Sequence, residues 1–164
     1  MPQLGRIQLR PEEVLERYAA GPQSGVFTDG SCEGNPGPGG WGVVWVEDGK
    51  ILAERNGRDP ATTNNRMELA ALIAAYELLP EGADVTVHSD SQLCVRTVNE
   101  WAEGWERRGW KRKGGPIANL ELVKKLYALA GQHPRVTLKW IKAHDGSLWN
   151  EYADALASAY LFES

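Results

Sequence analysis

The amino-acid sequence predicts an α/β domain, in which helices pack on a mixed β-sheet. Two observations carry this prediction: three short strand patterns come first, and helical and strand patterns then alternate to the end of the chain. The 164 residues suffice for one domain with a hydrophobic core, and they contain neither an internal repeat nor a low-complexity linker. We therefore expect one folded domain over residues 25–164 and an N-terminal appendage over residues 1–24.

The appendage lacks the dense apolar pattern of the remaining chain. Pro11 suits the first turn of a short helix, with Val14, Leu15 and Tyr18 on one face, and Gly21-Pro22 would end it. We expect a surface helix or a loosely held tail without a binding motif.

Short apolar runs predict strands over residues 26–29, 41–46, 51–55, 84–88 and 136–141. Asp48-Gly49 is a strong signal for a tight hairpin, whereas residues 30–40, which are rich in glycine, and residues 56–63 are expected to be loops. Apolar residues at helical spacing predict helices over residues 66–79, 92–101, 119–131 and 148–161. Trp41, Trp45 and Trp140 lie on predicted strands, where we expect them in the core.

Composition and charge limit the class of protein. No apolar run approaches the roughly 18–20 residues of a membrane-spanning helix, residues 1–10 lack the apolar stretch of a signal peptide, and the two cysteines form no zinc motif. We expect a cytoplasmic protein. The formal net charge is -4, but one short segment is strongly basic and could hold a phosphate backbone. Its cations are Arg107, Arg108, Lys111, Arg112 and Lys113, interleaved with Trp101, Trp105 and Trp110.

Four acidic residues lie in unusually apolar stretches: Asp29, Glu68, Asp90 and Asp154. A buried charge is costly unless it is compensated. Either each carboxylate has its own polar partner, or the four converge on divalent cations. Two hard cations about 3.5–4 Å apart are the usual clamp for displacement at phosphorus. Oxygen ligands favour Mg²⁺, with Mn²⁺ as a substitute.

Five motifs, in order, resemble those of type 1 ribonuclease H of the bacterial branch. They are Phe27-Thr28-Asp29-Gly30-Ser31-Cys32 with Gly34-Asn35-Pro36-Gly37, then Thr62-Thr63-Asn64-Asn65-Arg66-Met67-Glu68-Leu69, Ser89-Asp90-Ser91-Gln92, the tryptophan-rich basic segment, and Lys142-Ala143-His144 with Asn150-Glu151 and Ala153-Asp154. The resemblance extends from about residue 26 to residue 161. Each motif alone is weak, but the ordered set is specific.

The resemblance implies a ribonuclease H-like fold, a five-stranded mixed sheet in the order 3-2-1-4-5 with strand 2 antiparallel, flanked by helices. It implies an endonuclease that hydrolyses the RNA strand of RNA–DNA hybrids and leaves 5′-phosphate and 3′-hydroxyl ends. Two Mg²⁺ ions per active site would act with substrate, and Mn²⁺ would substitute. The family also implies a monomer that needs no membrane and no obligate protein partner.

By resemblance, Asp29, Glu68, Asp90 and Asp154 are the metal-binding catalytic carboxylates, and His144 assists proton transfer or product departure. Further matches to the family's substrate-binding residues are Asn35, Asn64, Asn65 and Gln92 as groove-reading amides, Thr63 and Asn119 as a pocket for a DNA phosphate, and Trp101 and Trp105 in a basic protrusion over residues 101–118. Plain alternatives remain: the glycine-rich segment as an ordinary loop, Asn64-Asn65 as a helix start, and the tryptophans as packing for the protrusion.

Three departures from the family pattern bear on the site. Ala61 replaces a frequent arginine, for which Arg58 is the candidate substitute, and Ala143 replaces a glycine before His144. Asp145, Leu148 and Trp149 make the following loop unusual, and Asp145 is expected to add negative charge near the site. We expect these changes to alter turnover or metal preference rather than the reaction.

Two other functions compete with this prediction. A non-catalytic hybrid-binding module would keep the fold without activity, although all the acidic residues and His144 are present. Another nuclease of the same superfold, such as a junction resolvase or a transposase core, would share the carboxylates but not the Asn64-Asn65-Arg66-Met67 run.

Overall fold

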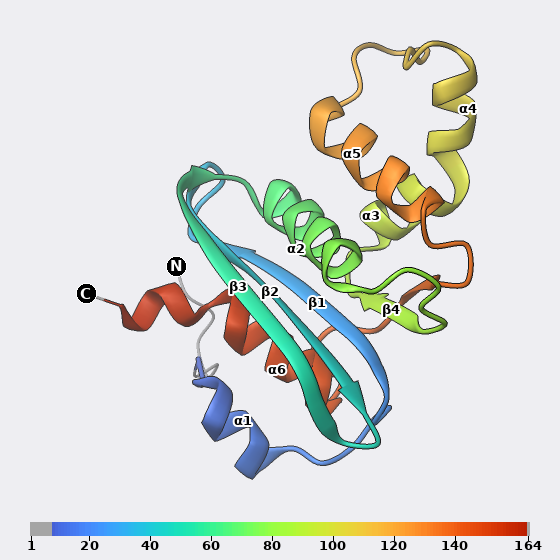
Figure 1. The fold of residues 1–164 in the computed structure, drawn as a ribbon. Coiled ribbons are helices and arrows are strands. Elements are labelled where there is room, and N and C mark those ends of the chain that lie inside the picture. The colour runs from blue at the N-terminus through green and yellow to red at the C-terminus, as the bar shows by residue number, and fades with distance from the viewer. Residues whose placement is uncertain (1–7, 164) are drawn as a thin grey trace.

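The computed structural model describes residues 8–163 and contains one five-stranded sheet in the order β3-β2-β1-β4-β5 (Figure 1). The strands are β1 (Gly25–Cys32), β2 (Gly37–Glu47), β3 (Lys50–Thr62), β4 (Thr86–Ser89) and β5 (Thr137–Trp140). β2 pairs antiparallel with β1 and β3, whereas β4 pairs parallel with β1 and β5. The predicted mixed sheet and its strand order are confirmed.

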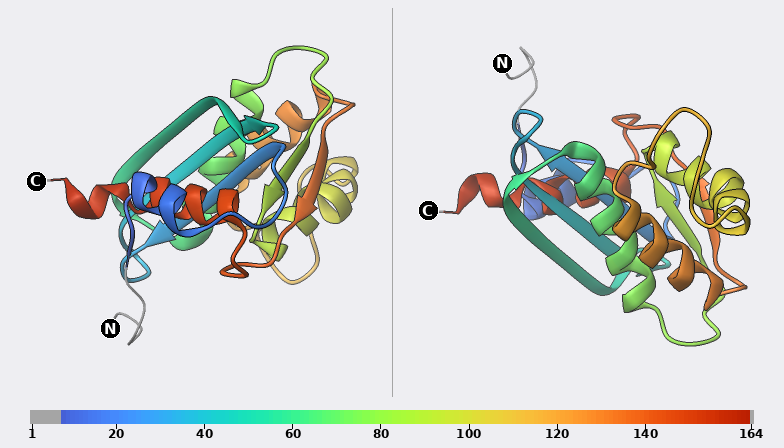
Figure 2. Two further views of the ribbon diagram at one scale, coloured as in Figure 1. Left: turned by 90° about the horizontal axis from the view of Figure 1, so that it is seen from below. Right: turned by 90° about the horizontal axis from the view of Figure 1, so that it is seen from above.

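Helices cover both faces of the sheet (Figure 2). They are α1 (Pro11–Arg17), α2 (Asn64–Leu78), α3 (Gln92–Arg96), α4 (Ala102–Arg107), α5 (Leu120–Gly131) and α6 (Leu148–Ala157). A π-helical turn, Thr97–Trp101, joins α3 to α4, and a 3₁₀ turn, Ala159–Phe162, follows α6. None of the helices in the described part of the chain combines the length and apolarity needed to cross a bilayer.

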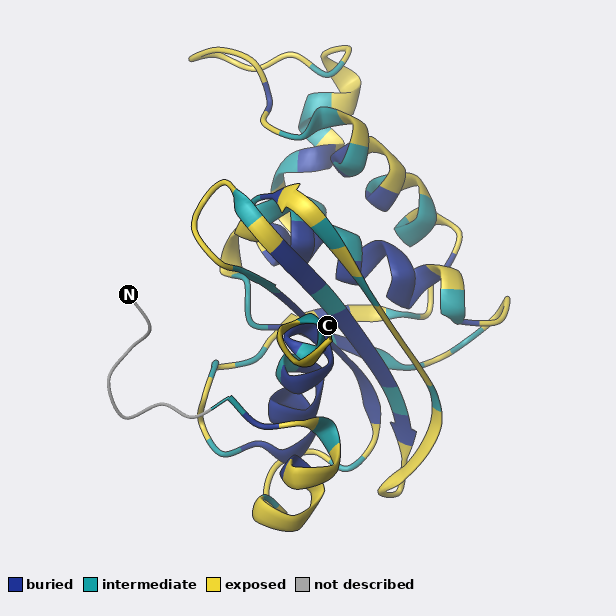
Figure 3. Cartoon of the chain, turned by 90° about the vertical axis from the view of Figure 1, so that its left-hand side faces the viewer, coloured by how far each residue is buried: buried dark blue, intermediate teal, exposed yellow. Residues whose placement is uncertain are grey.

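Two apolar clusters hold the helices to the sheet, one on each face. Val26 of β1 belongs to the cluster with α2 and α5, whereas its neighbour Phe27 belongs to the cluster with α1 and α6. Successive residues of a strand point to opposite faces, so Asp29 shares the α6 face with Phe27. Figure 3 shows the buried central strands beside the more exposed edge strand β3.

The expected glycine-rich loop over residues 30–40 is wrong in extent, because β1 continues to Cys32 and β2 begins at Gly37. The glycines allow close packing rather than loop freedom. A Cβ on Gly40 would lie 2.2 Å from the carbonyl oxygen of Ala157, and one on Gly42 would lie 2.5 Å from the Cβ of Leu156. Glycine in β2 therefore lets α6 approach the sheet.

The expected loop over residues 56–63 is also wrong, because β3 extends to Thr62. Gly37 pairs with Thr62 and Gly39 with Asp59, so the long hairpin continues beside β2. An edge strand faces solvent along much of its length and tolerates proline, which hides its pattern in the sequence. The hairpin turn itself is confirmed: Asp48 and Gly49 have φ values of 50° and 79°, as a type I′ turn requires.

Two further predictions need correction. Helical backbone does not stop at residue 101 but continues through α4 to Arg107, so part of the basic segment is helical. Trp140 is 47% exposed rather than in the core, and its indole Nε1 donates a hydrogen bond to the carbonyl oxygen of Asp90 at 3.2 Å. Trp41 and Trp45 are partly buried and pack against the cluster beneath α2.

The N-terminal segment contains the expected short helix, α1, which packs against α6. Val14 is 2% exposed and Leu9 is 8% exposed, both within the cluster that contains α6. Leu15, predicted to lie on one face with Val14, is 46% exposed. The segment is therefore docked through Val14, with Leu15 turned toward solvent.

Candidate active site

Three carboxyl groups converge at the carboxyl ends of the parallel strands β1 and β4. Ligand oxygens of Asp29, Glu68 and Asp90 all lie within 4.8 Å of one another. Asp29 comes from β1, Asp90 follows β4 directly, and Glu68 lies on the second turn of α2. The close approach of α2 depends on Gly30, because a Cβ there would lie 2.4 Å from the backbone nitrogen of Glu68.

This acidic centre is buried and electrostatically strained. Asp29 and Glu68 are each 5% exposed. Burial, followed by repulsion from Glu68, Asp90 and Asp154, raises the pKa of Asp29 well above its usual range. Burial, followed by repulsion from Asp90, likewise raises the pKa of Glu68. Within the described chain, the cleft around these groups is lined by no lysine or arginine, so a bound cation is what could balance them.

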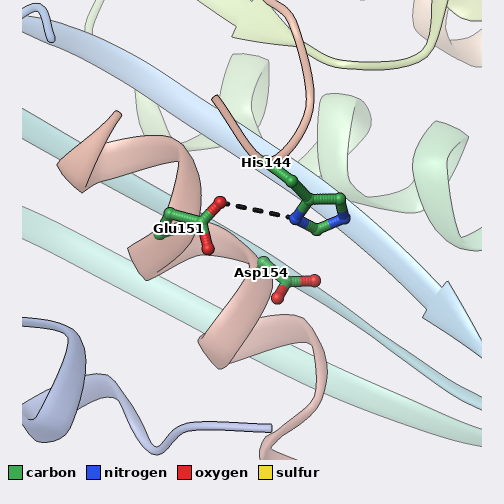
Figure 4. Close-up of side chains that lie close together, drawn as sticks. All are labelled: His144, Glu151 and Asp154. Carbon is green, nitrogen blue, oxygen red and sulfur yellow. Dashed lines mark hydrogen bonds and ion pairs between the residues drawn. The ribbon is translucent and has the colours of Figure 1, made fainter. Parts of the chain in front are cut away.

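A second cluster adjoins the acidic centre. Ligand atoms of His144, Glu151 and Asp154 lie within 4.8 Å of one another, and the His144 Nδ1 lies 3.4 Å from the Glu151 Oε1 (Figure 4). Glu151 and Asp154 are three residues apart on α6, so they share one face of that helix. Asp154 also contacts Asp29 through a side-chain hydrogen bond, which contributes to the raised pKa of Asp29. The two clusters therefore meet.

One cleft of about 1160 Å³ contains Asp29, Glu68, Asp90, His144 and Asp154. The structure thus brings together all five residues predicted to be catalytic. The sequence interpretation did not assign a role to Glu151, although it stands in the quoted Asn150-Glu151 motif. The sequence feature that could have identified Glu151 is its spacing of three residues from Asp154. A charged residue in the first turn of a helix is, however, too common to identify a site.

The loop before α6 differs from expectation at two positions. Asp145 does not line the cleft: its carboxylate oxygen lies 4.0 Å from the Lys142 Nζ, and both side chains are largely exposed. Trp149 is 2% exposed in the apolar cluster between α1 and α6. The expected extra charge is therefore paired outside the cleft, and Trp149 is a core residue. His144 itself has a left-handed backbone, with φ 53°.

The predicted groove-reading amides occupy different surroundings. Asn64 lines the acidic cleft, and its backbone nitrogen donates to the Asn35 Oδ1 at 3.2 Å. Asn65 lines a neighbouring groove, where the Cys94 Sγ lies 3.5 Å from its Oδ1. Gln92 is exposed at the start of α3 and lines neither hollow.

The predicted phosphate pocket contains an arginine that the sequence interpretation did not single out. Arg66 donates from Nη1 to the Asn119 Oδ1 at 3.0 Å, and its backbone nitrogen donates to the Thr63 Oγ1 at 3.2 Å. The Arg66 Nη1 is also paired with the Glu121 Oε1 at 2.7 Å, whereas Arg58 is paired with Glu163 near the end of the chain and contacts neither pocket residue. Arg66 therefore brings together the two predicted pocket residues, and the suggestion that Arg58 substitutes for the missing arginine is not supported by this contact.

The basic protrusion borders a groove of about 880 Å³. Trp101 and Trp105, whose ring centroids are 6.0 Å apart, line it together with four of the five predicted cations: Arg108, Lys111, Arg112 and Lys113. Trp110 does not line this groove and packs edge-on against Tyr127 of α5, with centroids 6.1 Å apart. Two of the three tryptophans thus accompany the cations at a groove, and the third fixes the protrusion to α5.

Comparison with known proteins agrees with this arrangement. The family model described as RNase H matches residues 22–161. A ribonuclease HI of Caulobacter vibrioides is 46% identical over 138 residues, which span 84% of this chain and 91% of the relative. LC9-RNase H1, a type 1 RNase H, has a TM-score of 0.71 at 34% identity, with 85% of this chain and 74% of that chain covered. LC11-RNase H1, solved in complex with an RNA/DNA hybrid, has a TM-score of 0.59 at 27% identity, with coverage of 83% and 97%. The chain therefore belongs to the ribonuclease H family and is similar to bacterial ribonuclease HI.

Proposed function

We propose that the acidic centre and the adjoining His144 cluster hydrolyse the RNA strand of RNA–DNA hybrids with the help of divalent cations, Mg²⁺ in the first place. The reaction class follows from family membership: the protein is a ribonuclease H, an RNA–DNA hybrid endonuclease. The observation that carries the assignment of residues is the convergence of Asp29, Glu68 and Asp90 within 4.8 Å in a buried cleft.

The residues present fit a hard cation. Asp29, Glu68 and Asp90 offer only oxygen donors, and the Glu68 Oε1 is buried without a hydrogen-bond partner. An unbonded buried carboxylate oxygen is costly, and a divalent ion is a suitable partner for it. Mg²⁺ suits such donors and Mn²⁺ is the expected substitute. When bound, two such ions would polarise the scissile phosphate and lower the pKa of the attacking water.

The side chains of the second cluster would complete the reaction. Asp154 faces Asp29 and would share in holding the cations. His144 turns Nδ1 toward Glu151, which leaves Nε2 available for proton exchange at the leaving oxygen. Its side chain is 46% exposed, so it can contact the phosphate at the mouth of the cleft.

Two surfaces are proposed for the substrate. The RNA strand would lie across the acidic cleft, where Asn35 and Asn64 flank the carboxylates and can contact 2′-hydroxyl groups. The DNA strand would follow the groove of the basic protrusion, with Trp101 and Trp105 beneath it and one phosphate near Arg66 and its partners Thr63 and Asn119. Gln92, at the start of α3, would complete the set of amides. The proposal includes a monomeric cytoplasmic enzyme without an obligate protein partner, as the resemblance implies.

Strand-specific cleavage tests the proposal. A hybrid labelled separately on each strand should be cut only in its RNA strand, with 5′-phosphate and 3′-hydroxyl products, in Mg²⁺ but not with a chelator. Duplex DNA, duplex RNA and single strands should remain intact. Binding of the hybrid without cleavage would instead indicate a hybrid-binding module, and cutting of duplex DNA would indicate another nuclease of the superfold.

A further inference from the structure

The N-terminal segment over residues 8–23 makes close contacts with the helix that carries two of the site's acids. Almost all of it precedes residue 22, where the family match begins. Val14 and Leu9 are buried in the same apolar cluster as Trp149 and Tyr152 of α6. The Arg10 guanidinium carbon also lies 4.5 Å from the centroid of the Phe162 ring. The segment is thus docked along α6.

The same segment caps the first turn of α6. Ser147 occupies the N-cap position, but its side chain makes no capping hydrogen bond. The Ala20 carbonyl oxygen instead accepts from the Leu148 backbone nitrogen at 2.8 Å, within an isolated bridge between Ala20 and Ser147. The Trp149 Nε1 donates to the Gln23 Oε1 at 3.2 Å. The first N–H groups of a helix need acceptors from outside it, and here the N-terminal segment provides one.

This cap fixes one end of the short loop that carries His144. The other end is held where the Ile141 backbone nitrogen donates to the Ser89 carbonyl oxygen at 2.9 Å, next to Asp90. Residues 142–147 therefore connect two anchored points. The fit at the cap is tight, because a Cβ on Gly21 would lie 2.3 Å from the Ser147 Oγ.

The segment also reaches the cleft itself. Gln8 lines the acidic cleft, and a smaller hollow of about 380 Å³ lies between α1 and the second cluster. Its walls include Val14 and Arg17 on one side and His144, Glu151 and Asp154 on the other. A displacement of α1 would thus open the wall behind these three side chains.

From these contacts we propose that the N-terminal segment is a positioning element of the active site, which holds the His144 loop and the start of α6 in the geometry needed for turnover. The inference rests on the proposed role of the His144 cluster. Small displacements of catalytic groups lower rates strongly while substrate contacts elsewhere persist. The segment should therefore affect kcat more than KM, since the groove proposed for the DNA strand is lined by α2, α3, the π-helical turn, α4 and residues 108–118, and by no residue of the segment.

A matched pair of substitutions in the full-length protein tests the inference. Val14→Asp places a charge at the buried face of α1, whereas Leu15→Asp places the same charge on its exposed face. Val14→Ala is a milder companion that removes contact without adding charge. Steady-state cleavage of a hybrid is measured at a temperature where circular dichroism shows each variant folded. Imidazole NMR signals are recorded in parallel for His144 and for His133, which packs on Tyr76 on the other face of the sheet.

We expect Val14→Asp to lower kcat by about tenfold or more with KM within about twofold, and to shift the His144 signals but not those of His133. Leu15→Asp should match the wild type. If Val14→Asp does not fold, Val14→Ala should show the same pattern with a smaller change. Unmoved His144 signals in the folded Val14 variants would overturn the inference, as would an equal shift at His133 or an equal effect of Leu15→Asp. The NMR comparison needs no turnover, so it distinguishes a failure of the positioning role from a failure of the proposed catalytic assignment.

Discussion

Replacing Asp29 by asparagine separates charge repulsion from catalysis, because the amide keeps the shape of the side chain but removes its charge. Asp29 is 5% exposed, and its carboxylate oxygen lies within 4.8 Å of carboxylate oxygens of Glu68 and Asp90. Without cations these groups repel one another, and the raised pKa of Asp29 reflects its burial first and that repulsion second. We expect Asp29→Asn to abolish cleavage and to stabilise the metal-free protein.

The size of the stabilisation follows from Coulomb's law. Two unit charges at the outer separation of 4.8 Å repel by about 3 kcal/mol at an effective dielectric constant of about 20. Asp29 has two such neighbours, but partial protonation already relieves some of the repulsion. We therefore expect a gain of about 2 kcal/mol in the free energy of unfolding, or about 4–8 °C in Tm for a chain of this size.

The pH dependence of stability independently predicts that Asp29→Asn stabilises the protein. The ordinary pKa values are 3.8 for Asp29 and 4.5 for Glu68, and both are raised in the folded protein, by burial above all. The folded state therefore binds more protons than the unfolded state between the ordinary and the raised values, and its stability falls as pH rises through that window. Asp29→Asn removes the contribution of Asp29 to this loss of stability. The increase in Tm relative to the wild type should therefore be larger at neutral pH than near pH 4.

Thermal unfolding with a chelator, and then with increasing Mg²⁺ or Mn²⁺, measures these effects. Cations should raise the Tm of the wild type and have much less effect on Asp29→Asn, because binding to the folded state alone stabilises it. Glu81→Gln controls for the change in net charge, because Glu81 is an exposed acid after α2 that does not line the acidic cleft. A lower Tm for Asp29→Asn in the presence of chelator, or full cleavage activity, would refute the reasoning.

Three further predictions concern the surroundings of the acidic centre. Asp154→Asn should reduce kcat less than Asp29→Asn, since Asp154 lies outside the cluster of Asp29, Glu68 and Asp90, and a peripheral ligand can be replaced by an amide oxygen; equal losses in a cleavage assay would contradict this. Neutralising all five cations of the basic protrusion should weaken hybrid binding and flatten the slope of log affinity against log salt by up to about five, whereas an unchanged slope in a titration would exclude backbone contacts there. Arg66→Ala should raise KM for the hybrid by about tenfold, and Arg58→Ala should leave KM unchanged, because only Arg66 contacts the predicted phosphate pocket; the reverse order would restore Arg58 as the pocket residue.

The departures at Ala143 and Asp145 were both expected to alter turnover or metal preference, but the structure places only Ala143 in the acidic cleft. Asp145 is paired with Lys142 outside the cleft, so Asp145→Ala should change kcat by less than about twofold. Ala143 does line the cleft, beside His144, and Ala143→Gly should lower kcat by loosening the backbone there. Steady-state rates for the two variants distinguish them, and a large effect of Asp145→Ala alone would show that its charge reaches the site.

The sequence predicted which carboxylates converge better than it predicted where the strands begin and end. Asp29, Glu68 and Asp90 could be identified because a carboxylate in an apolar stretch is costly, and the structure brings all three together. The extent of β1 and β2 could not, because glycine between residues 30 and 40, Gly40 included, indicates a loop by its local preference. Its use here is to admit α6 at close range, and that depends on residues more than a hundred positions away.

The contact between Glu151 and His144 and the docking of the N-terminal segment could not be predicted, for a related reason. Nothing in the residues around Glu151 shows that His144 will lie 3.4 Å from it, since the loop between them must first be folded back. Nor does Val14 reveal its partner, because one apolar residue in a short amphipathic helix is compatible with a free surface helix as well as with a docked one. Both features arise only when α6 is placed between the sheet and α1, with the Ala20 carbonyl at its first turn. The carboxylates proposed to perform the chemistry can thus be recognised by their residue type, whereas the residues that hold them in place are defined by tertiary contacts alone.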